Sequence, residues 1–357
     1  MNVRPPFMTP PNPRPIGALL SLTLLGAARL AYSQGCIPAH YISLSLGAQG
    51  INYLEPGQWE ADVSYRYLHS EDVFIGTEEQ PQLHRLGGRN TIHSIDLNVT
   101  YEITPRFSAS LTLPFLHDEF SLPNDDGKRH EGSSGGLGDM RLVGNAWLLS
   151  PPEHPNGNIN IGIGVKFPTG DARATDTFYT SSGQPIIRPV DIAAQPGDGG
   201  WGLFLELQAF QKLMNNLYAY ASGFYLINPR DSNGTEREFP TSTAVNSVPD
   251  QYLGRVGLSY SIWPARGLAV TLGARIDGVL VTDAVGDSNG FRRAGYALYV
   301  DPGINWAFGK NTLSVNVPVA VERNLQASTY LDNGVLQTSR AGAFADFIVV
   351  VAFSRRF

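Results

Sequence analysis

The strand pattern at the C-terminal end, which stops at Phe357, most constrains the fold of this chain. Large apolar side chains occupy every second position from Phe347 to Phe353, and Asp346 and Ser354 belong to the interleaved set. A strand presents alternate residues to opposite faces, so the pattern predicts a strand with one apolar face. In a soluble domain an apolar terminal strand would fray into water. In a membrane barrel the last strand pairs with the first and its outer face meets lipid, so the pattern favours a barrel over a soluble sandwich.

Residues 1–33 have the organisation of a secretory signal peptide. Arg4 and Arg14 precede an apolar run from Ile16 to Ala28, and Ala31-Tyr32-Ser33 has the small-x-small form of a cleavage site. The apolar run is too short to cross a bilayer. We therefore expect this segment to be removed from the mature protein.

The rest of the chain is predicted to contain a short N-terminal segment and one domain. Residues 34–56 are mildly apolar without a sustained period, and they form either a periplasmic tail or a plug in the barrel mouth. Residues 57–357 carry the barrel pattern. Cys36 is the single cysteine, so no internal disulfide forms. The residues before Cys36 lack the aliphatic side chain expected three places ahead of a lipidated cysteine, which argues against a lipoprotein.

The charge balance argues against nucleic acid as a partner. The chain carries 26 Lys and Arg against 32 Asp and Glu, and residues 1–33 contain three of the arginines and no acidic residue. The mature chain is therefore more acidic than the whole, whereas nucleic-acid-binding proteins present basic surfaces.

Apolar and polar residues alternate along segments of about ten residues, as they do where lipid and lumen lie on opposite faces of a strand. The sequence predicts an all-β transmembrane antiparallel barrel of 12 strands, with ten and fourteen as alternatives. The predicted strands before the C-terminal one are 58–68, 94–103, 107–115, 140–148, 159–167, 201–213, 217–227, 252–262, 268–276, 296–308 and 313–321.

The links between these strands alternate between short and long. The short links are rich in turn-forming residues, as in Thr104-Pro105-Arg106 and Met214-Asn215-Asn216. The intervening links are much longer, as over residues 168–200 and 228–250. This alternation is typical of outer-membrane barrels, with tight periplasmic turns and long extracellular loops.

Four short motifs resemble those of outer-membrane transporters of the phenol meta-pathway degradation family. They are Gly57-Gln58-Trp59-Glu60, Gly135-Gly136-Leu137-Gly138-Asp139, Lys166-Phe167-Pro168-Thr169-Gly170-Asp171 and Gln195-Pro196-Gly197-Asp198-Gly199-Gly200. The resemblance covers roughly residues 57–215. It implies a barrel associated with the uptake of small, often aromatic or hydrophobic compounds. The terminal Phe357 resembles the recognition signature of bacterial outer-membrane barrels, which implies the barrel-assembly machinery as a partner alongside outer-membrane lipid.

Charged residues on the predicted inner face are candidate lumen residues. They form either a selective constriction or a network of ion pairs, because charge inside a barrel requires water or partners. The predicted set is Glu60, Asp62, Arg66, Asp96, Glu102, Arg141, Lys166, Glu206, Arg255, Arg275, Asp301, Glu322 and Asp346.

Aromatic residues on the same predicted face form either a path for an aromatic solute or core filling in a closed lumen. A register error of one residue would turn them outward. The set is Phe204, Phe210, Tyr218, Tyr220, Phe224 and Tyr299.

No catalytic, cofactor or metal site is predicted. The seven histidines form no His-x-His or His-x3-His pair of the kind used for zinc. Ser232 and Ser288 each lie in a Ser-Asn-Gly turn that resembles part of the active site of outer-membrane phospholipase A, but no histidine closely precedes either serine. A serine without a base is not an activated nucleophile.

The leading functional prediction is therefore passive uptake of small, hydrophobic or aromatic solutes across the bacterial outer membrane, without covalent chemistry or cofactor. The alternatives are a lipid-modifying barrel enzyme and a closed structural or adhesive barrel that binds a partner through its outer loops.

Overall fold

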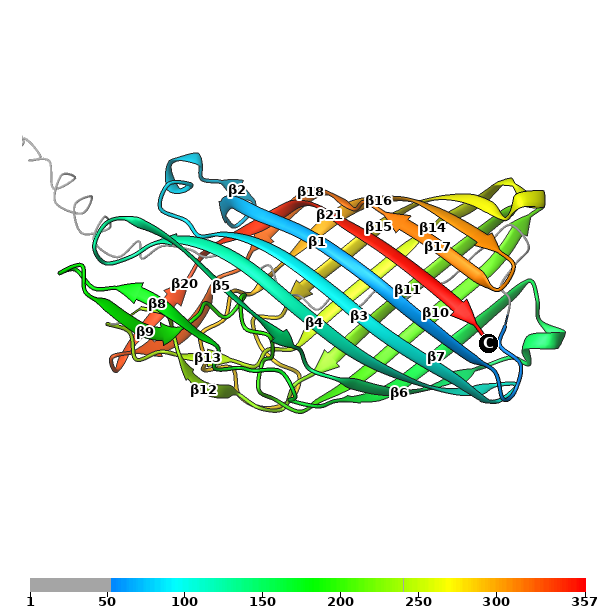
Figure 1. The fold of residues 1–357 in the computed structure, drawn as a ribbon, viewed down its shortest axis with the longest axis horizontal. Coiled ribbons are helices and arrows are strands. Elements are labelled where there is room, and N and C mark those ends of the chain that lie inside the picture. Colours follow the sequence, from blue (N-terminus) through cyan, green and yellow to red (C-terminus); the bar gives the residue numbers. More distant parts are fainter. Residues whose placement is uncertain (1–52, 240) are drawn as a thin grey trace, which may run out of the picture. The chain divides into compact units, whose positions relative to one another are not determined.

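The computed structural model describes residues 53–239 and 241–357, so the predicted signal peptide, Cys36 and most of the predicted N-terminal segment lie outside the described residues. Twelve antiparallel barrel strands form one closed barrel, as the sequence predicts (Figure 1). In the described part of the chain, no helix has the length and hydropathy needed to cross a membrane.

Most barrel strands are continuous. They are β1 Trp59–Ile75, β3 Arg89–Thr104, β4 Phe107–Pro123, β7 Gly157–Lys166, β10 Gly202–Met214, β11 Leu217–Ile227, β14 Gln251–Trp263, β15 Leu268–Val279, β16 Gly295–Phe308 and β21 Ala341–Arg356. Two are interrupted: the fourth comprises β5 Arg129–Leu137 and β6 Arg141–Trp147, and the eleventh comprises β17 Asn311–Asn316 and β18 Val319–Leu325.

Pairing between the first and last strands closes the barrel. Glu60 lies opposite Arg356 at one end of this seam, and Ile75 lies opposite Ala341 at the other. The backbone N–H of Phe357 donates to the carbonyl of Trp59 at 2.9 Å, which continues the seam to the last residue. Closure leaves no unpaired sheet edge, which is the requirement for strands in a bilayer.

Neighbouring strands are in a register that separates an apolar outer face from a polar inner face. Val63 of β1 lies opposite Leu97 of β3, and both side chains are exposed on the outside. On the other face, Asn98 of β3 lies opposite Thr112 of β4, and the Thr112 hydroxyl donates to the Asn98 side chain at 2.8 Å. Period-two alternation therefore places apolar side chains toward lipid and hydrogen-bonding side chains inside.

The predicted short turns lie together at one end of the barrel. The backbone φ of Asn216 is 66° and that of Gly309 is 60°, so both adopt the left-handed conformation that tight turns require. Two further turns contain 3₁₀ helices, η3 Pro151–Glu153 and η4 Pro264–Arg266.

Long loops cover the opposite end, and several fold into hairpins (Figure 1). These are β8 Thr175–Tyr179 with β9 Pro185–Pro189, β12 Ser232–Glu236 with β13 Val245–Ser247, and β19 Ser328–Asp332 with β20 Val335–Ser339; β2 Glu78–Glu79 and η2 Pro81–Leu83 follow β1. Here β1, β3 and β4 extend well past their predicted ends at 68, 94 and 115. Strand pairing and the alternation of buried and less buried side chains both continue there, for example in β3 and β4.

Candidate functional site

The inner face of the barrel carries most of the predicted charged residues. Those placed on the inward row are Glu60, Asp62, Arg66, Asp96, Glu102, Arg141, Lys166, Glu206, Arg255, Arg275 and Asp301. At these positions the side chains point to the face that the alternation along each strand predicts.

The structure places Glu322 on the outer row and not in the lumen, where the sequence predicts it. A register shift between β16 and β18 puts Glu322 opposite Leu298 on the outer row, where it accepts a hydrogen bond from the Tyr296 hydroxyl at 2.9 Å. Asp346 is exposed beside an irregularity in the pairing of β21 with β1, and it forms an ion pair with Arg323, which lies opposite the inward-facing Ala297. One extra residue in a strand reverses the facing of the residues beyond it.

Buried charges in the middle of the lumen are paired across the inner face. The Arg141 Nη1–Glu206 Oε1 distance is 3.2 Å, the Arg255 Nη2–Asp301 Oδ2 distance is 2.7 Å, and the Arg275 Nε–Asp277 Oδ1 distance is 3.1 Å. No side chain in these pairs is more than 10% exposed. Charges removed from water are costly unless they meet partners, so these pairs form an internal network.

The predicted aromatic residues lie within the same network. The rings of Phe204 and Phe224 meet edge to face with centroids 5.6 Å apart. The guanidinium carbon of Arg141 lies 5.5 Å from the Phe204 ring centroid. In the same way Arg255 approaches the Tyr220 ring and Arg275 approaches the Tyr299 ring, at 5.8 Å and 5.6 Å. Phe210, Tyr218 and Tyr220 form a second buried group. The rings therefore occupy lumen volume and shield the ion pairs from water.

A cavity of about 120 Å³ lies where the lumen meets the long loops. Its polar lining includes Arg66, Asp96, Asp139, Lys166 and Asp198, and its apolar lining includes Leu116, Ile192, Ala193, Pro196 and Val279. A concave, partly apolar space with a few charged groups is the usual form of a small-molecule site.

Asp139 joins the three glycine-rich motifs that follow the first barrel strand. Its carboxylate accepts the N–H of Gly170 at 3.0 Å and the N–H of Asp198 at 3.1 Å. Lys166 lies 3.5 Å from this carboxylate and also forms an ion pair with Asp198. The motifs that carry the family resemblance therefore meet at one wall of the cavity. The lumen prediction missed Asp139 and Asp198, whose only sequence signal was turn chemistry.

The loop over the cavity is held from several sides. The Arg293 guanidinium binds the Asp191 carboxylate, with an Nη1–Oδ1 distance of 2.9 Å, and both side chains are almost fully buried. The Gln195 side chain donates to the carbonyl of Val190 at 2.9 Å and accepts the N–H of Ala174 at 2.8 Å. These contacts order the segment 190–198 as a roof.

The serines of the two Ser-Asn-Gly turns make hydrogen bonds within the long loops. The Ser288 hydroxyl donates to the Asp283 carboxylate at 3.0 Å and accepts the N–H of the same residue at 2.9 Å. Asp283 also binds Arg292 through both carboxylate oxygens, at 2.7 and 2.6 Å. Ser232 begins β12, and its carbonyl accepts a hydrogen bond from Arg230 at 2.8 Å.

The beginning of the described chain enters the barrel at the short-turn end. The Tyr53 ring meets Trp147 edge to face at a centroid distance of 5.0 Å and lies 6.3 Å from Phe210. Its hydroxyl donates to the carbonyl of His154 at 3.1 Å. Tyr53 therefore fills part of the lumen next to the inward-facing Phe210.

Comparison with solved structures finds the same fold in an outer-membrane protein. An outer-membrane channel from Pseudomonas putida F1 has 15% sequence identity and a TM-score of 0.56. The alignment covers 86% of this chain and 98% of the channel. The chain shares its fold with this channel. The monoaromatic hydrocarbon channel CymD (10% identity, 93% and 98% coverage, TM-score 0.44) and the P. putida toluene transporter TodX (11%, 85% and 91%, 0.40) are also similar. No family profile matches the chain. No curated protein matches it.

Proposed function

We propose that this barrel is a passive outer-membrane channel for small, hydrophobic or aromatic solutes, and that the cavity under segment 190–198 is its solute-binding station. The cavity is the observation that carries the proposal. Its volume of about 120 Å³ is close to the roughly 150 Å³ of an engineered apolar cavity that holds benzene. Leu116, Ile192 and Val279 supply apolar contact.

The likeness to an outer-membrane channel supports the same proposal at the level of the fold. The solute would meet polar groups of both signs, Arg66 and Lys166 against Asp96 and Asp198, so we expect no strong preference for anions or cations. Transport would require no covalent chemistry, because passage depends on binding and release alone.

Three further parts of the proposal concern assembly and closure. Outer-membrane lipid surrounds the apolar exterior, and Phe357 presents the terminal aromatic to the barrel-assembly machinery. Residues 34–56 act as a plug at the short-turn end, which the lumenal position of Tyr53 supports. Removal of residues 34–56 from the mature chain should raise conductance in a planar bilayer, whereas a plain periplasmic tail would leave conductance unchanged.

A closed structural or adhesive barrel is the second candidate, because paired charges and aromatic rings occupy the lumen. Single-channel recording separates the two. Stepwise conductance in either the mature chain or the shortened chain supports a channel. Silence in both, with binding of a partner that depends on the long loops, supports the closed barrel.

Solute binding in the cavity is tested with fluorobenzene as the probe. Its fluorine NMR signal is recorded in the presence of the refolded mature chain in micelles. Ala193→Phe fills the cavity, and Ala274→Phe adds the same ring to the exposed lipid-facing side of β15. We expect Ala193→Phe to remove the protein-dependent broadening of the fluorine signal and Ala274→Phe to retain it. Equal broadening in both variants would locate the probe in the micelle and contradict the binding station.

A further inference from the structure

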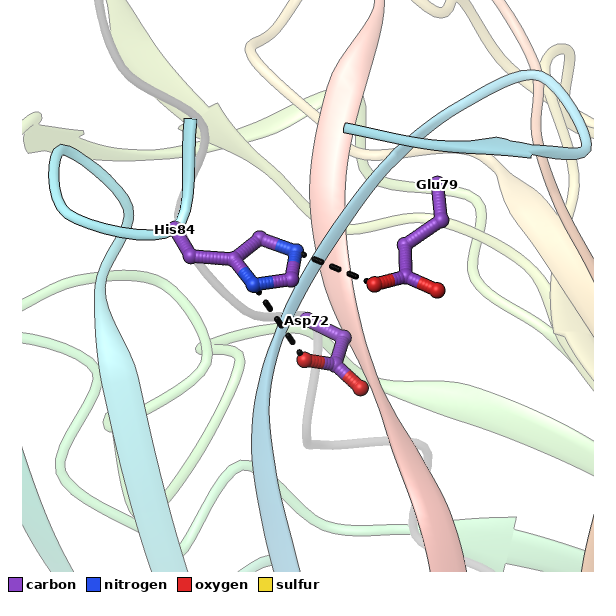
Figure 2. A group of neighbouring side chains, drawn as sticks. All are labelled: Asp72, Glu79 and His84. Atoms are coloured by element: carbon purple, nitrogen blue, oxygen red, sulfur yellow. Dashed lines mark ion pairs between the residues drawn. The ribbon is translucent and has the colours of Figure 1, made fainter. Parts of the chain in front are cut away.

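A histidine and two carboxylates gather on the rim of the barrel at its long-loop end, outside the cavity. Asp72 lies near the end of β1, Glu79 lies in β2, and His84 follows η2 (Figure 2). The chain turns back at Gly76, whose φ is 58°, and β2 pairs with β1 so that Glu79 lies opposite Phe74. This hairpin brings together side chains that are separated along the sequence.

The three side chains point toward one another, and each carboxylate faces a different nitrogen of the imidazole (Figure 2). The His84 Nδ1–Asp72 Oδ1 distance is 3.6 Å and the His84 Nε2–Glu79 Oε1 distance is 3.4 Å. Direct hydrogen bonds between charged groups are shorter, at about 2.7–2.9 Å. Two ligands that share a tetrahedral ion at bonds of about 2.0–2.1 Å lie about 3.3–3.4 Å apart. The two measured distances involve different ring nitrogens, so one ion would bind His84 through one nitrogen and the carboxylate on the other side would turn toward it.

One ring nitrogen and one oxygen from each carboxylate fall within 4.8 Å of one another. A point between such atoms lies within small side-chain rotations of bonding distance to all three. In addition, His84 Nε2 is inaccessible to solvent and makes no hydrogen bond. A ring nitrogen that makes no hydrogen bond keeps its lone pair free for a ligand when the other ring nitrogen carries the proton.

We propose that Asp72, Glu79 and His84 bind a divalent transition-metal ion, with Zn²⁺ as the ion that fits best. Imidazole nitrogen with carboxylate oxygen is a donor set that zinc accepts, and water completes the tetrahedron. The histidine ligand selects against Ca²⁺ and Mg²⁺, which prefer oxygen donors alone. The two carboxylates balance the charge of the ion.

Binding would join the β1–β2 hairpin to the loop that follows η2. The neighbouring part of this loop is already tied down, because Arg129 donates to the carbonyls of Arg85 and Gly87 at 2.9 and 2.8 Å. The hairpin also borders the seam of the barrel, where Phe74 lies opposite Gly342 of β21. The ion would therefore hold the outer end of the seam and order part of the rim.

The test uses the refolded mature chain after treatment with a chelator, with Co²⁺ as a spectroscopic probe and Zn²⁺ as its competitor. We expect one equivalent of Co²⁺ to give visible absorption that Zn²⁺ abolishes. His84→Ala and Asp72→Asn should each weaken Zn²⁺ binding at least tenfold. His117→Ala is the matched control, because His117 is an exposed histidine 3.7 Å from Glu119 and should bind as the wild type does.

Hydrogen exchange of residues 72–84 supplies a second readout that does not depend on the probe. Zn²⁺ should slow exchange there in the wild type and in His117→Ala, but not in His84→Ala. The proposal is overturned if His84→Ala binds Zn²⁺ as tightly as the wild type. It is also overturned if the segment is ordered by acid alone, without metal, since a protonated imidazole would then bridge the two carboxylates.

Discussion

Breaking the lumenal pair between Arg255 and Asp301 should strongly destabilise the barrel. Arg255 Nε and Nη2 each lie 2.7 Å from Asp301 Oδ2, and the other carboxylate oxygen accepts from Asn316 at 3.2 Å. The side chains are 10% and 1% exposed. Removing one partner leaves the other charge buried and uncompensated, so Arg255→Met or Asp301→Leu should each cost about 3–5 kcal/mol. The double variant should lie near the wild type, because both buried charges are removed together.

The assay is equilibrium urea unfolding of the barrel in phospholipid vesicles, with a double-mutant cycle to isolate the coupling between the two residues. The loop pair Arg188–Glu236 is the control, since its N–O distance is a comparable 3.1 Å but Glu236 is half exposed. Glu236→Gln should cost less than about 1 kcal/mol. Additive single effects of that smaller size at Arg255 and Asp301 would refute the reasoning. Such a result would mean that water solvates the lumenal pair, as in an open pore.

Three other predictions concern the loops and the seam. Burial raises the pKa of the Glu238 carboxyl, and Arg237 partly offsets this shift. The contribution of Glu238 to the stability of the folded protein is therefore greatest in acid, and it falls as the pH rises from the unfolded-state pKa through the folded-state pKa. Glu238→Gln should make the urea midpoint less dependent on pH. Gly197→Ala should destabilise the folded protein by about 1–3 kcal/mol, because the added methyl group would lie 2.6 Å from the backbone of Gly170. Gly144→Ala is the control, since the methyl group has space there, and thermal unfolding of the two variants provides the comparison. Deletion of Phe357 should lower the amount of folded barrel in cells, measured on gels as the fraction whose migration changes on heating. Refolding of the purified variant in detergent should change little.

Architecture was accessible from the sequence because strand periodicity is local. Alternation over residues such as Val63 and Leu97 identifies the outer face of a strand without knowledge of its neighbours. Turn chemistry at Asn216 and Gly309 requires only backbone conformation, and it separates short links from long ones. Antiparallel order and the facing of most lumen residues follow from these two signals.

The same local reasoning failed where β18 changes register against β16. Glu322 lies on the outer row because β18 has one more residue than β16 at the register shift between them, and a count along one strand does not reveal that residue. A bulge depends on the pairing of two strands, and it reverses the face to which every later residue of the bulged strand points.

Sequence alone therefore determined that this chain forms an antiparallel membrane barrel with a polar inner face, and the structure decided for twelve strands over the alternatives of ten and fourteen. Only the tertiary structure decided which distant groups meet. Asp139 gathers backbone from two later motifs, and Arg293 binds Asp191 across 102 positions of sequence. Asp72 and His84 come together only because a hairpin reverses the chain between them. The physical reason is that periodicity is a property of one strand, whereas a site depends on the spatial convergence of several segments.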